Sequence, residues 1–235
     1  MPADPSIEIP KQNSLSTLAR CEIERRILGG EYPPGSKLIE ADLAGELRVS
    51  RGPVREAFRA LEQTGLVRSE QNRGVFVRQV SLAEANEIYE VRAALEGMIG
   101  RLAALRIRPE RVEKVREVVK KMHAVGRMRD GAAYFPLNVE FHELLAEAAG
   151  NKALHANYRR VVNELDLYRR ETLSRSAENI PISTKEHEAI LNAVARGDAA
   201  LAGGLLFAHV VDSRERLHQA LAKPPAQPLK PARAA

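Results

Sequence analysis

The sequence contains no tryptophan, a single cysteine and few aromatic residues, and each scarcity narrows the class of protein. Phenylalanine, tyrosine and tryptophan make up 4% of the 235 residues, so aliphatic side chains must fill any core. The lone Cys21 excludes an internal disulfide and is typical of a reducing compartment. The chain has no run of about 18 apolar residues, and no basic stretch followed by an apolar one opens it. We therefore expect a cytoplasmic protein with no membrane partner.

The composition is that of a globular protein, with 44% hydrophobic and 29% charged residues. Runs of β-branched residues are short, whereas alanine, leucine, arginine and glutamate are abundant, which favours helices. The length allows one large domain or two small ones. A formal charge of +5 permits a nucleic-acid partner, but the distribution of the charge is more informative than its sum.

The first third of the chain predicts three helices followed by a hairpin. The helices are expected over residues 15–28, 40–47 and about 50–64, and the strands over 66–68 and 74–78. Apolar residues spaced three or four apart, such as Ala19, Ile23 and Ile27, indicate the first helix, and Ser50 is a candidate N-cap for the third. This order is typical of a winged helix-turn-helix.

The rest of the chain predicts an all-α antiparallel bundle of six helices, with seven as the alternative. These helices are expected over residues 82–106, from Pro109 onward, and over 131–149, 152–176, 183–196 and 198–221, with a break at Pro181. The predicted fold class is therefore mainly α. The predicted divisions are a flexible lead-in (1–12), a winged helix-turn-helix DNA-binding domain (13–80), an all-helical effector-binding and dimerisation domain (81–222) and a disordered tail (223–235).

Positive charge is concentrated on the third helix and the hairpin. Residues 48–78 carry seven basic and three acidic side chains, a balance of +4, whereas residues 1–47 carry five basic and eight acidic ones, a balance of −3. Arg51, Arg55 and Arg59 are spaced four apart and share one helical face. Such a helix fits the major groove, where arginine can bind guanine bidentately. The alternative is that these arginines only solubilise an exposed helix.

Two glycines favour close approach to DNA. Gly52 has no side chain, so the start of the third helix can approach a phosphate. At the predicted hairpin tip, Arg73 and Gly74 are placed to reach the adjacent minor groove.

The N-terminal motifs closely resemble those of the DNA-binding domain of GntR-family bacterial transcription regulators. The matching segments are Tyr32 to Glu40, Leu43-Ala44, Val49 to Ala57, Leu61-Glu62, Gly65 to Val67 and Gly74 to Val77. The resemblance covers about residues 15–80. It implies a homodimer on a pseudo-palindromic double-stranded DNA operator, with DNA contacts from Arg48, Arg51, Arg55 and Gly74.

Three histidines lie on the apolar faces of three different predicted helices. His142 follows Asn138 by four residues, so both lie on one face, and His187 and His209 lie on the two later helices. Facing helices of a bundle can bring such side chains together, and three imidazoles with open positions suit Zn²⁺ or other first-row metals. The alternative is three separate core histidines. The other histidines, His123, His155 and His218, are expected at the surface.

The helical half resembles the FCD domain of the FadR-type GntR subfamily, in its shorter VanR-like form. The matching residues are Tyr89 to Arg92, Leu95-Glu96, Phe141-His142, Gly150-Asn151, Glu186-His187, Ile190, Gly197-Asp198 and His209. The resemblance implies a divalent metal held by an Asp and three His, which correspond to Asn138, His142, His187 and His209. Asn138 replaces the Asp, so the site has one negative charge fewer. Zn²⁺ is the first candidate, with Ni²⁺ and Mn²⁺ as alternatives.

The same resemblance implies a small carboxylic acid as effector. Arg92 can bind a carboxylate bidentately, and Tyr89 and Glu96 belong to the same matched segment. The other role open to Arg92 is an intrahelical ion pair with Glu96, four residues on, and the two roles can coexist.

These observations predict a metabolite-responsive, dimeric transcription regulator, with repression as the expected sign, and not an enzyme. Two alternatives remain open at this point. A metal-dependent hydrolase could use the histidines, but no general base is evident beside them because Asn138 cannot accept a proton. An architectural DNA-binding protein would have a purely structural helical half.

Overall fold

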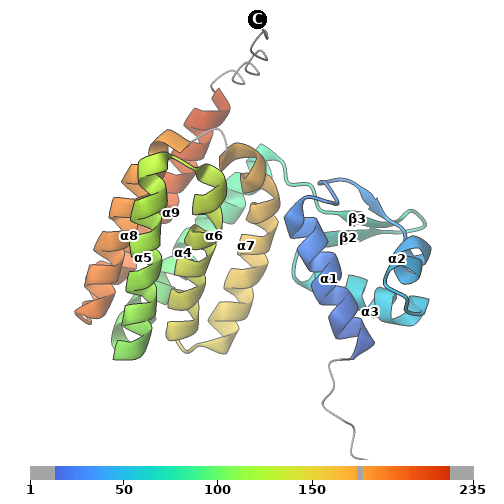
Figure 1. Ribbon diagram of the computed structural model, residues 1–235, viewed down its shortest axis with the longest axis horizontal. Coiled ribbons are helices and arrows are strands. Elements are labelled where there is room, and N and C mark those ends of the chain that lie inside the picture. The colour runs from blue at the N-terminus through green and yellow to red at the C-terminus, as the bar shows by residue number, and fades with distance from the viewer. Residues whose placement is uncertain (1–13, 174–176, 223–235) are drawn as a thin grey trace, which may run out of the picture. The chain divides into compact units, whose positions relative to one another are not determined.

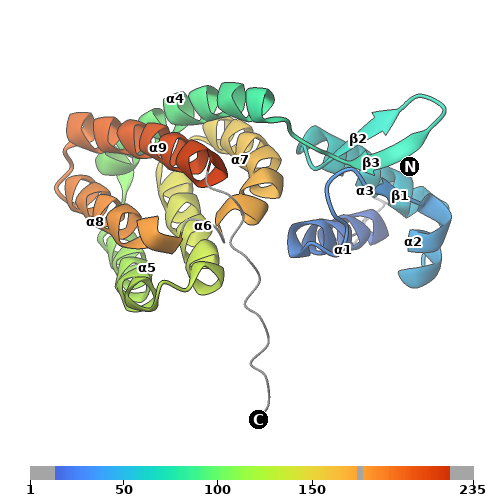
Figure 2. The same ribbon diagram turned by 90° about the horizontal axis from the view of Figure 1, so that it is seen from above.

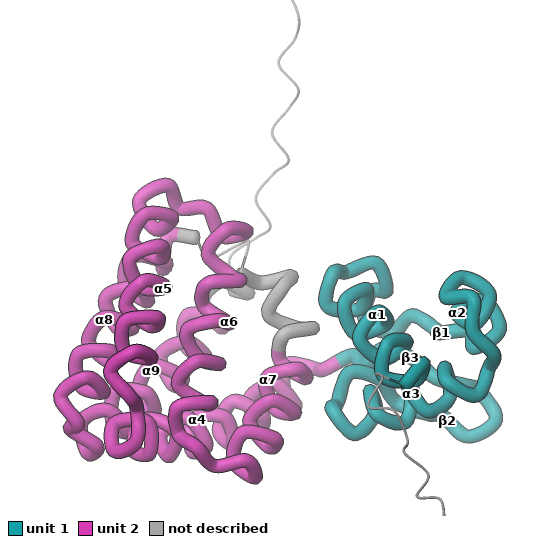
Figure 3. The backbone as a smooth tube through the Cα atoms, turned by 60° about the horizontal axis from the view of Figure 1, so that its bottom comes forward, with its two compact units in different colours: residues 1–79 teal, residues 80–235 magenta. Residues whose placement is uncertain are grey.

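The computed structural model describes residues 14–173 and 177–222, so the predicted lead-in (1–12) and tail (223–235) lie outside the described residues. The chain divides into two compact units, residues 1–79 and 80–235 (Figure 3). Helices predominate in both units, and the only sheet in the described part of the chain is small (Figure 1). The predicted fold class is confirmed.

The first unit is a three-helix domain with a small sheet. Its elements are α1 (Leu15–Gly29), β1 (Lys37–Leu38), α2 (Glu40–Glu46), α3 (Arg51–Gln63), β2 (Val67–Glu70) and β3 (Gly74–Val77). The strands are antiparallel in the order β1-β3-β2, with Val67 opposite Val77 and Lys37 opposite Phe76. The sequence predicted the β2–β3 hairpin but not β1, because a two-residue strand has no periodicity to detect.

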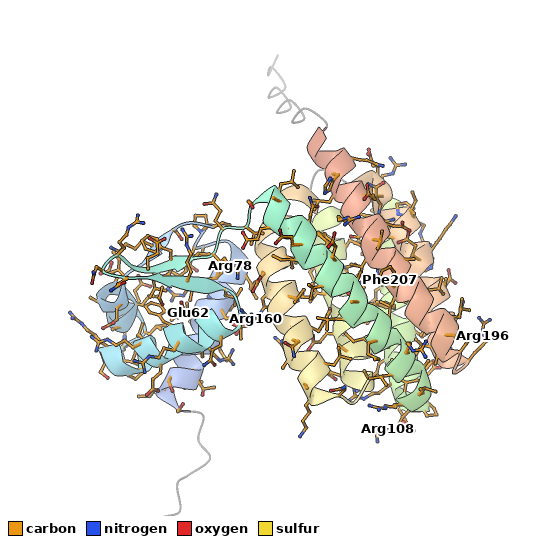
Figure 4. The ribbon with its side chains drawn as sticks, turned by 180° about the vertical axis from the view of Figure 1, so that it is seen from behind. Glu62, Arg78, Arg108, Arg160, Arg196 and Phe207 are labelled. Carbon is orange, nitrogen blue, oxygen red and sulfur yellow. The ribbon has the colours of Figure 1, made fainter. Side chains whose placement is uncertain are left out.

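Aliphatic side chains hold this unit together, as the scarcity of aromatics requires. Ile23 and Ile27 of α1 and Val54 and Leu61 of α3 are all at most 1% exposed. Glu62 of α3 accepts a hydrogen bond of 2.7 Å from the backbone N–H of Ser69, which joins the end of α3 to β2 (Figure 4). The core therefore fixes α3 while leaving its opposite face to solvent.

The second unit is an antiparallel bundle of six α-helices and a short 3₁₀ helix in the described residues. Its elements are α4 (Leu82–Arg106), α5 (Pro109–Met128), α6 (Gly131–Ala148), α7 (Lys152–Leu173), η1 (Ala177–Asn179), α8 (Ile180–Ala195) and α9 (Ala199–Ala222). Ser81 Oγ caps α4 by accepting a hydrogen bond of 3.2 Å from the N–H of Glu84. The predicted break at Pro181 is wrong. Proline lies in the first turn of α8, where the N–H it lacks has no intrahelical partner.

Helices α4 and α9 lie side by side and pack more closely than the other helices of the bundle (Figure 2). Glycines allow this approach: a Cβ atom on Gly100 would lie 2.6 Å from the backbone oxygen of Ala202. The core between the helices includes Met122, Phe141 and Leu206, each fully buried. In the described ranges, no helix is both long and apolar enough to cross a membrane.

Candidate functional site

Three buried histidines from three helices of the bundle converge on one point. His142 of α6, His187 of α8 and His209 of α9 are 2%, 0% and 4% exposed, and their candidate metal-binding atoms all lie within 4.8 Å of one another. The Nε2 atoms of His142 and His187 are 3.2 Å apart. The structure thus brings together residues separated by up to 67 positions in sequence.

Each histidine has a polar neighbour close to its Nδ1 atom. Glu96 Oε2 lies 2.6 Å from Nδ1 of His142, and Glu186 Oε2 lies 2.6 Å from Nδ1 of His209. The hydroxyl of Tyr134 lies 3.2 Å from Nδ1 of His187. Metal-binding histidines commonly have such partners, which orient the ring and leave the other nitrogen for the metal.

Burial favours the neutral form of two of the imidazoles, those of His142 and His187. Desolvation lowers the pKa of His142 to about 4, although Glu96 opposes this shift. Desolvation and the neighbouring His209 and His142 hold the pKa of His187 well below its ordinary value. Metal binding requires unprotonated imidazoles, so at neutral pH these two need lose no proton.

Arg92 and Glu96 of α4 form a buried ion pair at the edge of this cluster. Arg92 Nε donates a hydrogen bond of 2.7 Å to Glu96 Oε1, and each side chain is 1% exposed. Burial alone would raise the pKa of Glu96, but the charges of Arg92 and His142 outweigh it and hold that pKa well below its usual range. The guanidinium also lies over the ring of the buried Tyr89, 5.8 Å from its centroid.

Nδ1 of His142 has no partner in hydrogen-bonding geometry, although Glu96 Oε2 lies close to it. Two further hydrogen-bond donors near the cluster are buried without a partner. They are Nη1 of Arg92 and Nδ2 of Asn138, a residue that is 5% exposed and one helical turn before His142. An unsatisfied buried donor costs about 1–3 kcal/mol, more when it is charged. Both groups require an acceptor, so the site suits an oxygen-rich, anionic ligand.

The donor set fits a divalent metal. Ligand nitrogens about 2.0–2.1 Å from a tetrahedral zinc lie about 3.3 Å from each other. The 3.2 Å between Nε2 of His142 and Nε2 of His187 matches this spacing. Three nitrogen ligands would also leave coordination positions open.

The DNA-contact candidates are all exposed in the first unit. They are Arg48, Ser50, Arg51, Gly52, Arg55, Arg59, Arg73 and Gly74. Arg55 Nε forms an ion pair of 2.7 Å with Glu40 of α2. Ser50 lies at the N-cap of α3, but its side chain makes no capping hydrogen bond, contrary to the sequence prediction. The first N–H groups of α3 therefore lack this cap.

The small sheet formed by β1, β3 and β2, called the wing below, carries a basic residue that the sequence analysis did not identify as a DNA contact. Pairing of β1 with β3 places Lys37 and Arg73 near the ring of Phe76, with the Lys37 Nζ 5.9 Å and the Arg73 guanidinium carbon 5.7 Å from its centroid. Gly74, at φ +107°, is in a backbone conformation that L side chains rarely adopt. Lys37 thus joins Arg73 and Gly74 as a candidate for contact with DNA.

Sequence reasoning also missed Tyr134 and Glu186 as partners of the histidines. Each pairing joins residues on two different helices, which no local pattern reveals. The one signal was that Glu186 belongs to a segment that resembles the FCD domain. The remaining histidines lie outside the cluster and are partly buried rather than fully exposed. Their partners are Glu188 for His123, Glu143 for His155 and Asn86 for His218.

Comparison with known families places both units. Residues 15–77 match the family described as bacterial regulatory proteins, gntR family, and residues 87–212 match the FCD domain. The chain belongs to the GntR family and carries an FCD domain. The family resemblance predicted from the sequence motifs is thereby confirmed.

Relatives of this GntR-family protein are similar over nearly their whole length. A "Probable D-xylose utilization operon transcriptional repressor" of Paenarthrobacter nicotinovorans is 32% identical over 201 residues, which cover 85% of this chain and 87% of that protein. The "HTH-type transcriptional regulator LutR" of Bacillus subtilis is 30% identical, with 81% of this chain and 95% of that protein covered. The family and these relatives are transcription regulators and not enzymes, in agreement with the prediction from sequence.

Solved structures share the fold. A putative transcriptional regulator GntR from Rhodococcus sp. RHA1 has a TM-score of 0.70 and 27% identity, covering 87% of this chain and 98% of that one. The Escherichia coli protein McbR/YncC has a TM-score of 0.75 at 20% identity, covering 88% of this chain and 99% of that one, and is similar in fold alone.

Proposed function

We propose that this GntR-family regulator is an operator-binding repressor whose affinity for DNA changes when a small carboxylic acid binds inside the helical bundle. The observation that carries the proposal is the meeting of three buried histidines with the unpartnered donors of Arg92 and Asn138. A bundle core with only a structural role would satisfy these groups internally. We place this function in the cytoplasm, where bacterial DNA is accessible.

The chemistry of the centre selects an acid over a neutral compound. His142, His187 and His209 would hold the metal through their Nε2 atoms. Asn138, which is buried one helical turn before His142, would offer its side-chain oxygen as a further ligand. A bound divalent ion supplies a cationic centre with open positions for carboxylate oxygens. Arg92 Nη1 supplies a charged donor for the same ligand, because Glu96 already engages its Nε.

Recognition of DNA is assigned to α3 and the wing. The exposed arginines of α3 would read base edges, and the N-terminus of α3 would bind phosphate. The wing residues Lys37, Arg73 and Gly74 would contact the adjacent groove. One of the relatives is named a transcriptional repressor, which supports repression rather than activation as the function of this protein.

We infer that the chain forms a homodimer through the outer surface of α4 and α9. This α4–α9 surface consists of Val91, Ala94, Met98, Leu201, Gly204 and Phe207, all exposed. Phe207 lies beside α4 (Figure 4): if Gly97 of α4 carried a Cβ atom, that atom would lie 3.5 Å from the Cβ atom of Phe207. Extended apolar surfaces mark interaction sites, and a dimer would read two half-sites of a palindrome. Phe207→Glu should yield monomers by sedimentation at micromolar concentration, whereas Met128→Glu, also exposed, should leave the dimer intact.

Operator binding in the presence of acids tests the proposal. Duplexes selected from a random pool would supply the operator, and fluorescence anisotropy would measure its affinity. We expect at least one small carboxylic acid to weaken binding in the zinc-loaded protein, and D-xylose, a neutral sugar, to have no effect. Loss of the acid response in Arg92→Lys, with the operator affinity of the free protein unchanged, would support the site. If no acid in a broad panel changes the affinity, the bundle has no such effector.

A further inference from the structure

His209 is held by a carboxylate that is itself fixed on both oxygens. Glu186 Oε2 lies 2.6 Å from His209 Nδ1. Arg216 donates two hydrogen bonds to the same carboxylate, of 2.7 Å to Oε1 and 2.8 Å to Oε2. The three side chains thus form a chain from Arg216 on α9 through Glu186 on α8 back to His209 on α9. Such a bidentate pair limits rotation of the carboxylate.

This arrangement determines which nitrogen of His209 carries the proton. A carboxylate paired with arginine is ionised and can only accept hydrogen bonds, so His209 must donate from Nδ1. In the neutral ring, Nε2 then has a free lone pair. The ring of His209 lies 4.5 Å from that of His187 and 5.3 Å from that of His142, between centroids. The free Nε2 is therefore the atom His209 can offer to the shared centre.

We propose that Glu186 is the positioning residue that fixes His209 as a metal ligand, and that Arg216 holds Glu186 in place. This inference rests on the proposed metal site. His187 differs because its Nδ1 contacts an uncharged partner, the hydroxyl of Tyr134, which donates a hydrogen bond of 3.1 Å to Ser183. Glu96 faces His142 but also pairs with Arg92, so its removal would disturb two functions at once. Glu186 is the cleaner position for a test.

The first measurement needs no metal. Two-bond ¹H–¹⁵N spectra of the chelator-treated full chain report the tautomer of each histidine, and a His209→Gln variant identifies the His209 signals. We expect the Nδ1–H tautomer in the wild type and its loss in Glu186→Ala. Glu186→Gln should retain this tautomer, because the amide oxygen can still accept from Nδ1. Glu188→Ala, which changes an exposed carboxylate on the same helix, should have no effect on His209.

The second measurement is zinc affinity, determined in competition with a chelating dye. Loss of an outer partner of a metal-bound histidine commonly weakens metal binding about 10–100-fold. We expect a loss of this size in Glu186→Ala, a smaller one in Glu186→Gln and none in Glu188→Ala, with helix content unchanged by circular dichroism.

Two results would overturn the role of Glu186. The first is an Nε2–H tautomer of His209 in the metal-free wild type. The second is wild-type zinc affinity in Glu186→Ala, which would make the Arg216–Glu186 pair a structural link between α8 and α9. A wild-type chain that takes up no zinc would instead overturn the metal site, while the tautomer comparison would still show whether Glu186 orients His209.

Discussion

Arginines occupy opposite surroundings in the two units. On α3, Arg55 is 62% exposed and its ion pair with Glu40 is open to water, whereas Arg92 in the bundle is 1% exposed and paired with an equally buried Glu96. An exposed ion pair contributes little stability, so a phosphate or base can replace Glu40 at small cost. A buried pair is fixed by the cost of separating its charges, and Nη1 of Arg92, which has no partner, is a donor left for a ligand. The same residue type thus suits DNA contact in one unit and ligand binding in the other.

The largest effect is expected from breaking the buried pair. Glu96→Ala leaves the charge of Arg92 uncompensated, so we expect the free energy of unfolding to fall by about 3–5 kcal/mol in urea titrations. The double variant Arg92→Met, Glu96→Leu removes both charges and fills their space with apolar side chains, so it should be more stable than Glu96→Ala. Glu117→Ala, which removes an exposed pair with Lys120, should cost far less stability. Equal losses at the two sites would mean that burial does not distinguish the pairs.

Acid should destabilise the metal-free bundle. The unfolded chain protonates His142 below its ordinary pKa of 6.5, whereas the folded chain does so only near 4. The contribution of His142 to the free energy of unfolding is therefore complete above pH 6.5. It is lost as the pH drops to about 4, and the loss amounts to about 3 kcal/mol. Glu96, whose pKa is lowered, contributes a loss of the same sign below its ordinary value of 4.5. His142→Asn should flatten the curve of unfolding free energy between pH 6.5 and 5, and an unchanged slope would contradict the assignment.

On the exposed side of the comparison, Arg55→Ala should weaken operator binding. Loss of a bidentate base contact costs about 1–3 kcal/mol and relaxes sequence preference at one or two positions in each half-site. Glu40→Ala removes the competing partner of Arg55 and should leave the affinity equal or higher. Arg116→Ala, which removes an exposed paired arginine in the bundle, is the matched control. Wild-type affinity and preference in both Arg51→Ala and Arg55→Ala, with folding intact, would remove α3 from base recognition.

A smaller and two-sided effect is expected from Asn138→Asp. The new carboxylate adds a negative ligand near His142, so zinc should bind more tightly, by about tenfold for each 1.4 kcal/mol gained. The same charge repels an incoming acid, so the effector that releases the operator should bind more weakly. Calorimetric titrations with zinc and with that acid would measure both changes, and two changes in one direction would contradict the anionic nature of the ligand.

Most of the fold could be predicted because its signals are local. Apolar spacing marked helices such as α1 and α5, and Ser81 and Gly30 marked helix ends that the structure shows. Two errors have physical causes. The strand β1 is too short for a pattern, and Pro181 starts a helix as readily as it ends one.

The site was predictable in its residue types but not in its connections. His142, His187 and His209 could be named because each lies on an apolar stripe. Their Nδ1 partners depend on how α4, α6, α8 and α9 pack, and contacts such as that between Glu186 and His209 have no periodic signature. The sequence also left open whether Arg92 pairs with Glu96 or binds a ligand. In the structure the pair forms while Nη1 keeps no partner.

The central claim is that the buried histidines are a metal centre rather than core residues. Elemental analysis of the protein purified without a His tag, alongside His187→Ala, tests it most directly. We expect about one divalent ion per chain in the wild type and none in the variant, as three convergent imidazoles suit such an ion. If the wild type carries no metal and divalent ions do not raise its melting temperature, the claim is wrong, and Arg92 would have to bind any acid without a metal.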